Sequence, residues 1–140
     1  MGSAERFIPH KGEIEAGTLP NSFEAVLKNY EGAMECDLVL LADGEIAIVH
    51  PRDIGGSAAG IEQMGLSDIE AQRIPSDDPD REHGRAIPLM HELVGFASDT
   101  DTRLVMDLKA SNKEKAFVLV EKIIERLGKM RKDGAFKLNP

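Results

Sequence analysis

The chain has 140 residues, of which 41% are hydrophobic and 30% are charged, a composition that fits one globular domain over residues 1–140. Its formal net charge of −8, without a cluster of basic residues among aromatics, argues against binding to nucleic acid. No apolar run approaches the roughly 20 residues of a transmembrane helix, and the N-terminal sequence has no hydrophobic signal core, so we expect a cytoplasmic protein without a transmembrane segment.

The first predicted elements are a short strand and a helix. Residues 6–8 are extended in character and run into a loop that continues to about residue 20. We expect Asn21 to begin a helix, with Glu24 three residues later as its capping-box partner, and Gly32 to end it.

The next segment predicts a β-hairpin. Residues 34–41 alternate at their start and are rich in aliphatic side chains, as in a buried strand. Asp43 and Gly44 are a strong signal for a two-residue hairpin loop, after which residues 45–50 return as the second arm.

The second half of the chain predicts two helices on either side of a strand. Turn-rich sequence and a short helix near residues 66–72 lead to a helix that begins at Pro88 and a strand at residues 103–109. A long helix follows, with Ser111 and Glu114 as its capping box. Its apolar residues recur on one side, and they are Ala116, Phe117, Val120, Ile123, Ile124, Leu127 and Met130.

This order of elements predicts an α/β fold in which right-handed βαβ units form a parallel sheet. No GxGxxG motif follows the first strand, and no GxxxxGK[ST] motif occurs in the sequence. The nucleotide-binding folds therefore lack their chemical signature, which favours a barrel.

Two acidic residues interrupt the apolar strand. Glu35 and Asp37 are two residues apart, so they point to one face of the strand, about 7 Å from each other along it. With a two-residue loop, Asp37 would pair with His50, which gathers two carboxylates and an imidazole into one patch. Carboxylates among aliphatic side chains require a base or a cation, whereas on an edge strand they would face water.

The strand at residues 103–109 favours the first alternative. Asp107 and Lys109 share a face near its end, where α/β folds place their sites. Because Cys36 is the only cysteine, it cannot supply a thiolate zinc site or a disulfide, and we expect it to pack in the core. Three acids at the ends of two strands instead favour a hard divalent ion bound by oxygen, magnesium or calcium.

A series of short blocks extends over almost the whole sequence, and these blocks are His10-Lys11-Gly12, Asn21-Ser22-Phe23-Glu24-Ala25, Glu35-Cys36-Asp37, Leu41-Ala42-Asp43-Gly44, Ala47-Ile48-Val49-His50, Ile87-Pro88 and Asp107-Leu108-Lys109. In composition and order they resemble the motifs of the glycerophosphodiester phosphodiesterases, which share the barrel of the phosphatidylinositol-type phospholipases C. The resemblance implies a metal-dependent hydrolase of lipid metabolism that cleaves glycerophosphodiester or lysophospholipid substrates to an alcohol and glycerol 3-phosphate. The site residues it implies are His10 and His50 as acid and base, Glu35, Asp37 and Asp107 as ligands of Mg²⁺ or Ca²⁺, and Lys11 and Lys109 as phosphate contacts.

The sequence departs from the family's motifs at Lys11, Pro51 and Asp107, and Leu19-Pro20-Asn21 lacks the glutamate that precedes the family's asparagine. Lys11 replaces an arginine, which removes a planar bidentate contact to phosphate. Pro51 follows His50 where the family usually has an aspartate that could orient the imidazole. Asp107 replaces a glutamate and is one methylene shorter.

The length of the chain differs from that of a complete barrel, which typically needs about 250 residues. We expect a partial TIM (β/α)₈ barrel made of the first three βα units, with a β-hairpin extension after the second strand. Such a half-barrel exposes a strand edge and an apolar face, so the chain is a fragment of a longer protein, a homo-oligomer or a decayed relative. The competing function is a truncated, non-catalytic binding or assembly module that retains the ancestral site.

Overall fold

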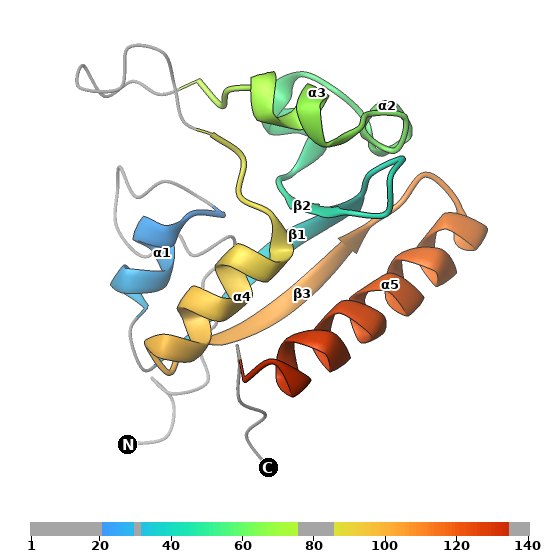
Figure 1. Cartoon of the computed structure of the whole chain (residues 1–140). Helices are drawn as coiled ribbons and strands as arrows, with labels where there is room; N and C mark the ends of the chain where they lie inside the picture. The colour runs from blue at the N-terminus through green and yellow to red at the C-terminus, as the bar shows by residue number, and fades with distance from the viewer. Residues whose placement is uncertain (1–20, 30–31, 76–85, 135–140) are drawn as a thin grey trace.

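The structure is a computed structural model that describes residues 21–29, 32–75 and 86–134 (Figure 1). The strand predicted at residues 6–8 lies outside the described residues, as do His10 and Lys11. No described helix combines the length and the apolar character needed to cross a bilayer. The described elements in chain order are α1 (Phe23–Lys28), β1 (Ala33–Leu40), β2 (Ile46–Ile48), the 3₁₀ helix η3 (Pro51–Ile54), α2 (Ala58–Ile61), α3 (Leu66–Ala71), α4 (Met90–Asp99), β3 (Arg103–Lys109) and α5 (Lys113–Lys132).

The sheet contains three described strands in the order β2-β1-β3. β1 and β3 are parallel, and their register runs from Ala33 opposite Arg103 to Val39 opposite Lys109. β2 pairs antiparallel with the end of β1. Figure 1 shows α4 and α5 beside β1 and β3, and α2 and α3 beyond β2. The fold is therefore mixed α/β, with a parallel pair whose two strands end at the same edge of the sheet.

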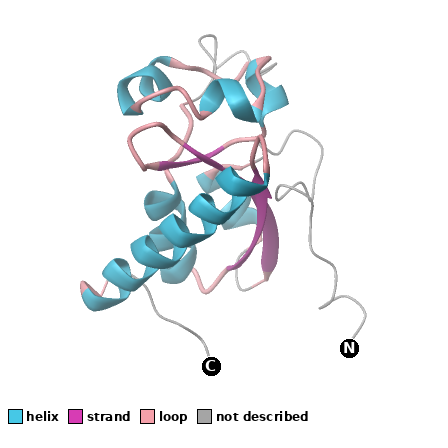
Figure 2. Cartoon of the chain, turned by 90° about the vertical axis from the view of Figure 1, so that its right-hand side faces the viewer, coloured by secondary structure: helices cyan, strands magenta, loops and turns pink. Residues whose placement is uncertain are grey.

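β1 separates two hydrophobic clusters, because alternate residues of a strand point to opposite faces. One cluster packs α1, α4 and α5 against the first face, and in Figure 2 α5 lies in front of the strands. β1 contributes Met34, Cys36, Leu38 and Leu40 to this first cluster. The second cluster packs α2, α3 and neighbouring loops against the other face, and the sheet contributes Val39, Leu41, Ala47 and Val49 to it. The predicted assignment of Cys36 to the core is confirmed, since its side chain is fully buried.

The hairpin loop between β1 and β2 is one residue longer than predicted. Leu41 N–H donates to the carbonyl oxygen of Glu45 at 2.8 Å, and Gly44 N–H donates to the carbonyl oxygen of Leu41 at 3.1 Å. The loop thus has three residues, with Gly44 in the left-handed conformation at φ 89°, which is the turn that three-residue hairpins favour. The Asp43 side chain also accepts a hydrogen bond from Leu66 N–H at 2.8 Å, so a contact with α3 holds this longer loop.

Both predicted capping boxes are wrong by one residue. Ser22, not Asn21, caps α1, because its Oγ accepts a hydrogen bond from Ala25 N–H at 3.1 Å. Asn112, not Ser111, caps α5, and its side chain accepts from Lys115 N–H at 2.8 Å. A neighbouring polar residue takes the cap in each case because the side chain of the predicted residue is engaged in a tertiary contact.

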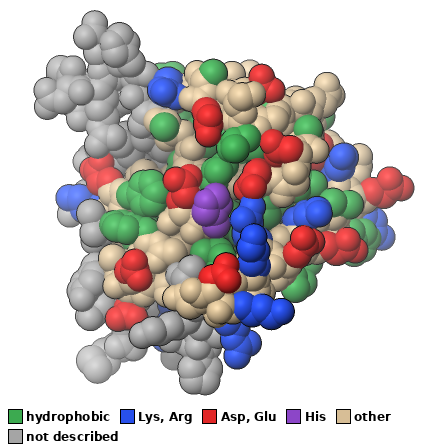
Figure 3. All heavy atoms as spheres, in the orientation of Figure 1, with side chains coloured by type: hydrophobic (Ala, Val, Ile, Leu, Met, Phe, Trp, Pro, Cys, Tyr) green, Lys and Arg blue, Asp and Glu red, His purple; other side chains and the backbone are tan. Residues whose placement is uncertain are grey.

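The apolar side of α5 is only partly covered. Leu119, Ile123 and Met130 are buried, whereas Phe117 is 60% exposed and Ile124 is 65% exposed. On the face drawn in Figure 3, apolar side chains lie among interspersed acidic and basic ones. The prediction left out Leu119, which is fully buried, and included Phe117, Val120 and Ile124, which are exposed, so the buried side of α5 differs from the predicted stripe.

Candidate metal centre

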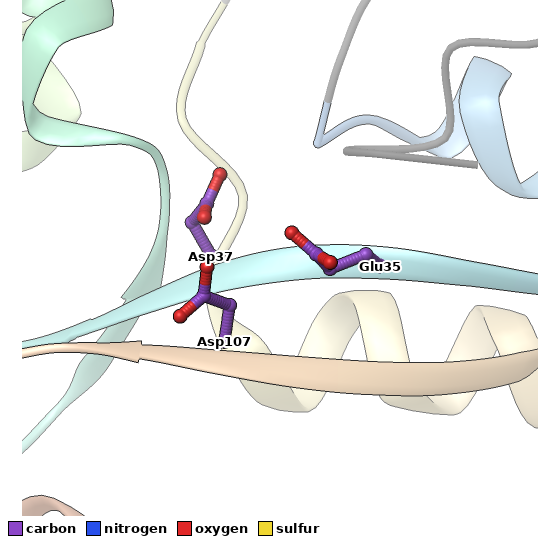
Figure 4. Close-up of side chains that lie close together, drawn as sticks. All are labelled: Glu35, Asp37 and Asp107. Atoms are coloured by element: carbon purple, nitrogen blue, oxygen red, sulfur yellow. The ribbon is translucent and has the colours of Figure 1, made fainter. Parts of the chain in front are cut away.

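Three carboxylates converge on one face of the parallel strands, within the strands rather than at their predicted ends. Glu35 and Asp37 point from β1, and Asp107 from β3, toward one another (Figure 4). The register places Asp37 directly opposite Asp107. One oxygen atom from each of the three side chains lies within 4.8 Å of the other two. The prediction that these acids converge is confirmed. Glu35 and Asp37 are two residues apart and point to the same face of β1, and Asp107, directly opposite Asp37, points to that face from β3.

The three acids differ in their exposure to water. Asp37 is fully buried, Glu35 is partly buried, and 39% of the Asp107 side chain is exposed. Asp37 Oδ2 accepts a hydrogen bond from Asn21 Nδ2 at 2.9 Å. Asp37 Oδ1, in contrast, is buried without a hydrogen-bond donor among the described residues. A buried, unsatisfied carboxylate oxygen carries a large desolvation cost unless a cation compensates it.

Lys109 is the described side chain that brings positive charge to these acids. Its Nζ lies 3.0 Å from Asp107 Oδ2 and 3.8 Å from Asp37 Oδ1. The hydrogen bond to Asp107 raises the pKa of Lys109, with smaller contributions from the charges of Asp107, Asp37 and Glu35, against the effect of burial. Within the described part of the chain, Lys109 thus places one positive charge beside Asp107 and Asp37. The donor set and the unsatisfied Asp37 oxygen therefore fit a hard divalent cation.

Cys36 points away from this centre. It belongs to the cluster on the opposite face of β1, and burial, followed by the charges of Asp37, Glu35 and Asp107, raises the pKa of its thiol to about 12. A neutral thiol on the far face of the strand does not join the carboxylates as a ligand.

His50 does not pair with Asp37 as predicted. Val49 takes that position, and its N–H donates to the carbonyl oxygen of Asp37 at 3.0 Å. The physical reason is the three-residue loop, since one extra loop residue shifts the register and reverses the side to which each residue points.

The His50 imidazole instead caps η3. Its Nδ1 accepts a hydrogen bond from Arg52 N–H at 3.1 Å, and Pro51 is the first residue of the short helix. An imidazole that accepts at Nδ1 carries its proton on Nε2 when neutral. The backbone amide of Arg52 thus orients the His50 ring.

Sequence reasoning missed Asn21 as part of this centre. The residue is fully buried, has φ 50°, and contacts Asp37 across 16 residues of sequence. Asparagine tolerates this left-handed conformation better than most residues, but it is also a common helix cap, and the sequence pattern around Asn21 predicts that role instead. The remaining described histidine, His91, is a partly exposed residue whose Nδ1 lies 3.9 Å from Glu45 Oε2, away from the three acids.

Known proteins resemble this chain in structure but not detectably in sequence. The sequence matches no protein-family model and no curated protein. The structure matches a glycerophosphodiester phosphodiesterase from Parabacteroides distasonis with a TM-score of 0.71 at 18% identity, over 89% of this chain and 51% of that one. It matches a phosphodiesterase from Oleispira antarctica, solved in complex with the product sn-glycerol-3-phosphate, with a TM-score of 0.65 at 20% identity, over 85% and 51%.

A third match adds the glycerophosphoryl diester phosphodiesterase domain of a Mycobacterium tuberculosis protein, with a TM-score of 0.65 at 16% identity, over 92% of this chain and 50% of that one. The fold of this chain is similar to that of about half of these phosphodiesterases. The resemblance that the sequence motifs indicate is therefore confirmed for the fold. The chain spans about half the length of the solved structures it matches, which is consistent with the N-terminal half of a glycerophosphodiester phosphodiesterase.

Proposed function

We propose that the chain carries the metal- and phosphate-binding part of a phosphoric diester hydrolase that acts on glycerophosphodiesters. The observation that carries the proposal is the buried and unsatisfied Asp37 oxygen between two further carboxylates in a glycerophosphodiester phosphodiesterase fold. In this proposal the chain provides the first three βα units of a TIM (β/α)₈ barrel that a longer protein would complete. The product bound to the Oleispira antarctica phosphodiesterase supports a glycerol phosphate as the group to be recognised.

In this proposal Glu35, Asp37 and Asp107 hold Mg²⁺ or Ca²⁺. The ion would supply positive charge against the phosphate oxygens of the diester. Lys109 is close enough to the acids to contact the same phosphate, and its raised pKa keeps it charged at neutral pH. Lys11 is proposed as a second phosphate contact on the basis of the sequence motif alone.

His10 and His50 are proposed as the acid and base. While Nδ1 accepts Arg52 N–H, the His50 ring is neutral and carries a hydrogen on Nε2, which can donate a hydrogen bond to a substrate oxygen. To protonate the departing alcohol, the ring must first gain a proton on Nδ1 and release Arg52 N–H, so that loss of the Nε2 proton then leaves a neutral imidazole. His10 would then accept the proton of the attacking hydroxyl, which can be the neighbouring hydroxyl of the glycerol group. An unperturbed imidazole changes charge near neutral pH, which suits an acid and base pair.

The test is release of glycerol 3-phosphate from glycerophosphocholine with Mg²⁺ or Ca²⁺, with and without a chelator. We expect the 140-residue chain to be weak or inactive, and a longer protein that contains it to be active if its reading frame continues beyond Pro140. In the active form, His10→Ala and Glu35→Ala should each abolish most of the activity, while Glu70→Ala, a change at an exposed acid on α3, should not. Activity that resists the chelator and both substitutions would contradict the proposal.

A second candidate function is that of an assembly module made of two copies of this chain. β3 is at the edge of the described sheet, Val105 on it is 42% exposed, and α5 presents the apolar residues Phe117 and Ile124 to solvent. A chain with half of a barrel would cover these surfaces with the matching half of a second copy, since exposed apolar faces and open edges promote association. We expect the isolated chain to form dimers in light-scattering measurements, and Phe117→Ser with Ile124→Ser to shift it to monomers. A cooperative wild-type monomer would contradict this function.

A further inference from the structure

We infer that Asn21 is the positioning residue of the metal centre, because its side chain sets the orientation of Asp37 so that a single carboxylate oxygen faces the cation. The inference rests on the proposed metal-binding function and adds a residue that belongs neither to the proposed ligands nor to the proposed phosphate contacts. Its basis is a pair of hydrogen bonds between two fully buried residues.

The two hydrogen bonds connect both the side chain and the backbone of Asp37 to the same amide. Asn21 Nδ2 donates to Asp37 Oδ2 at 2.9 Å, and Asp37 N–H donates to Asn21 Oδ1 at 3.0 Å. Two bonds between the same two residues close a ring, so the carboxylate cannot rotate without breaking one of them. In a buried site the lost bond would leave an unsatisfied polar atom, at the full cost of its desolvation.

As a consequence, the two oxygen atoms of the Asp37 carboxylate have different surroundings. Oδ2 is occupied by Asn21, and Oδ1 is left facing Lys109 Nζ at 3.8 Å, beside Asp107. Outer hydrogen-bond partners of this kind orient metal ligands and adjust their basicity. Because the Asn21 amide is neutral, it fixes Asp37 without adding a positive charge that would compete with the cation.

The local backbone explains why an asparagine occupies this position. Asn21 has φ 50°, a left-handed conformation that asparagine adopts more readily than most side chains other than glycine. Ser22 directly follows and caps α1, so the turn that presents Asn21 is joined to the start of a helix. The side chain therefore reaches Asp37 from a segment of the chain separate from β1.

The first experiment uses the wild-type chain and follows amide resonances by NMR during titration with Ca²⁺. We expect the Asn21 side-chain amide and the Asp37 backbone amide to shift, because the first donates to the ligand carboxylate and the second donates to Asn21 Oδ1. Asn29 provides the internal control, since its buried Nδ2 donates to the carbonyl oxygen of Ala25 at 2.6 Å instead. Shifts at Glu35 and Asp107 without any shift of the Asn21 amide would overturn the inference alone. Absence of any shift at the three acids would overturn the metal centre itself, and the inference with it.

The second experiment compares Asn21→Gly with Asn29→Gly, using the free Mn²⁺ signal in electron paramagnetic resonance. Glycine accepts the left-handed conformation, so Asn21→Gly removes the side-chain contacts without introducing backbone strain. We expect the dissociation constant for Mn²⁺ to rise about tenfold or more in Asn21→Gly. Asn29→Gly should lower the melting temperature without changing the dissociation constant. An unchanged dissociation constant in a folded Asn21→Gly variant would contradict the inference, and the NMR experiment decides the matter if this variant does not fold.

Discussion

The two faces of β1 show how one strand can serve stability on one side and binding on the other. Toward α4 and α5 the strand is apolar from Met34 to Leu40 and fully packed. On the opposite face it presents Glu35 and Asp37 and only then becomes apolar, at Val39. Burial of apolar area stabilises the first face, whereas Asn21 and Lys109 compensate the acids on the second. Substitutions on the two faces should therefore separate the free energy of unfolding from the affinity for a cation.

The largest effect is expected on the apolar face. Leu38 is fully buried there, so Leu38→Ala should lower the free energy of unfolding by about 3 kcal/mol through lost transfer energy and a cavity. Urea denaturation followed by circular dichroism measures the change. Val118→Ala, at a side chain of α5 that is 39% exposed, should change the same quantity by no more than about 0.5 kcal/mol. A weakened Mn²⁺ affinity in folded Leu38→Ala would show that the two faces are not independent.

The next effect concerns the counter-charge of the acidic face. Lys109→Met should lower the free energy of unfolding by roughly 1–2 kcal/mol, because it leaves the buried charge of Asp37 uncompensated. Ca²⁺ should then raise the melting temperature of the variant more than that of the wild type. Lys122→Met is the matched control, since Lys122 and Glu125 form a mostly exposed ion pair at 3.7 Å. Equal responses of Lys109→Met and Lys122→Met would contradict the role of Lys109.

The stabilising contribution of Lys109 should depend on pH. Its pKa is raised in the folded state, so its contribution to stability is complete below the ordinary value of 10.5 and is lost as the pH rises through the raised pKa. The difference in melting temperature between wild type and Lys109→Met should therefore be constant near neutral pH and shrink in strongly alkaline solution. A difference that grows with alkaline pH would have the wrong sign for this ion pair.

A smaller effect on the free energy of unfolding is expected at the loop that sets the register between β1 and β2. Asp43 accepts hydrogen bonds from Glu45 N–H at 3.2 Å and from Leu66 N–H at 2.8 Å, so Asp43→Ala should cost about 1 kcal/mol in thermal or urea unfolding. Asp99→Ala, at an exposed residue at the end of α4, is the control. If Asp43→Ala left both the stability and the hairpin register unchanged, α3 would not be what holds the longer loop.

The smallest effect on stability should come from a ligand of the acidic face. Glu35→Gln keeps the shape of the side chain and removes one of three clustered negative charges, so the free energy of unfolding should change by less than about 0.5 kcal/mol. The dissociation constant for Mn²⁺ should nevertheless rise at least about tenfold, because a charged ligand is lost. A large loss of stability with unchanged Mn²⁺ affinity would reverse the assignment of the two faces.

The sequence by itself determined which side of β1 each residue occupies. The period of two in residues 34–41 depends only on local backbone geometry, so it correctly separated the acids from Cys36 and Leu38. The matching spacing in β3 then predicted that Asp107 would join them. The bounds of β3 were also correct, since a short β-branched and aliphatic strand between turn residues is a local signal.

Only the tertiary structure decided the contacts between segments. The hairpin register depended on Asp43 reaching α3, which converts a two-residue loop into one of three residues and moves His50 out of line with Asp37. The caps shifted because Asn21 and Ser111 had partners distant in sequence, Asp37 and Glu62. Local patterns fix the direction of a side chain along its own element, whereas the partner of a polar side chain is chosen by the elements that packing brings beside it.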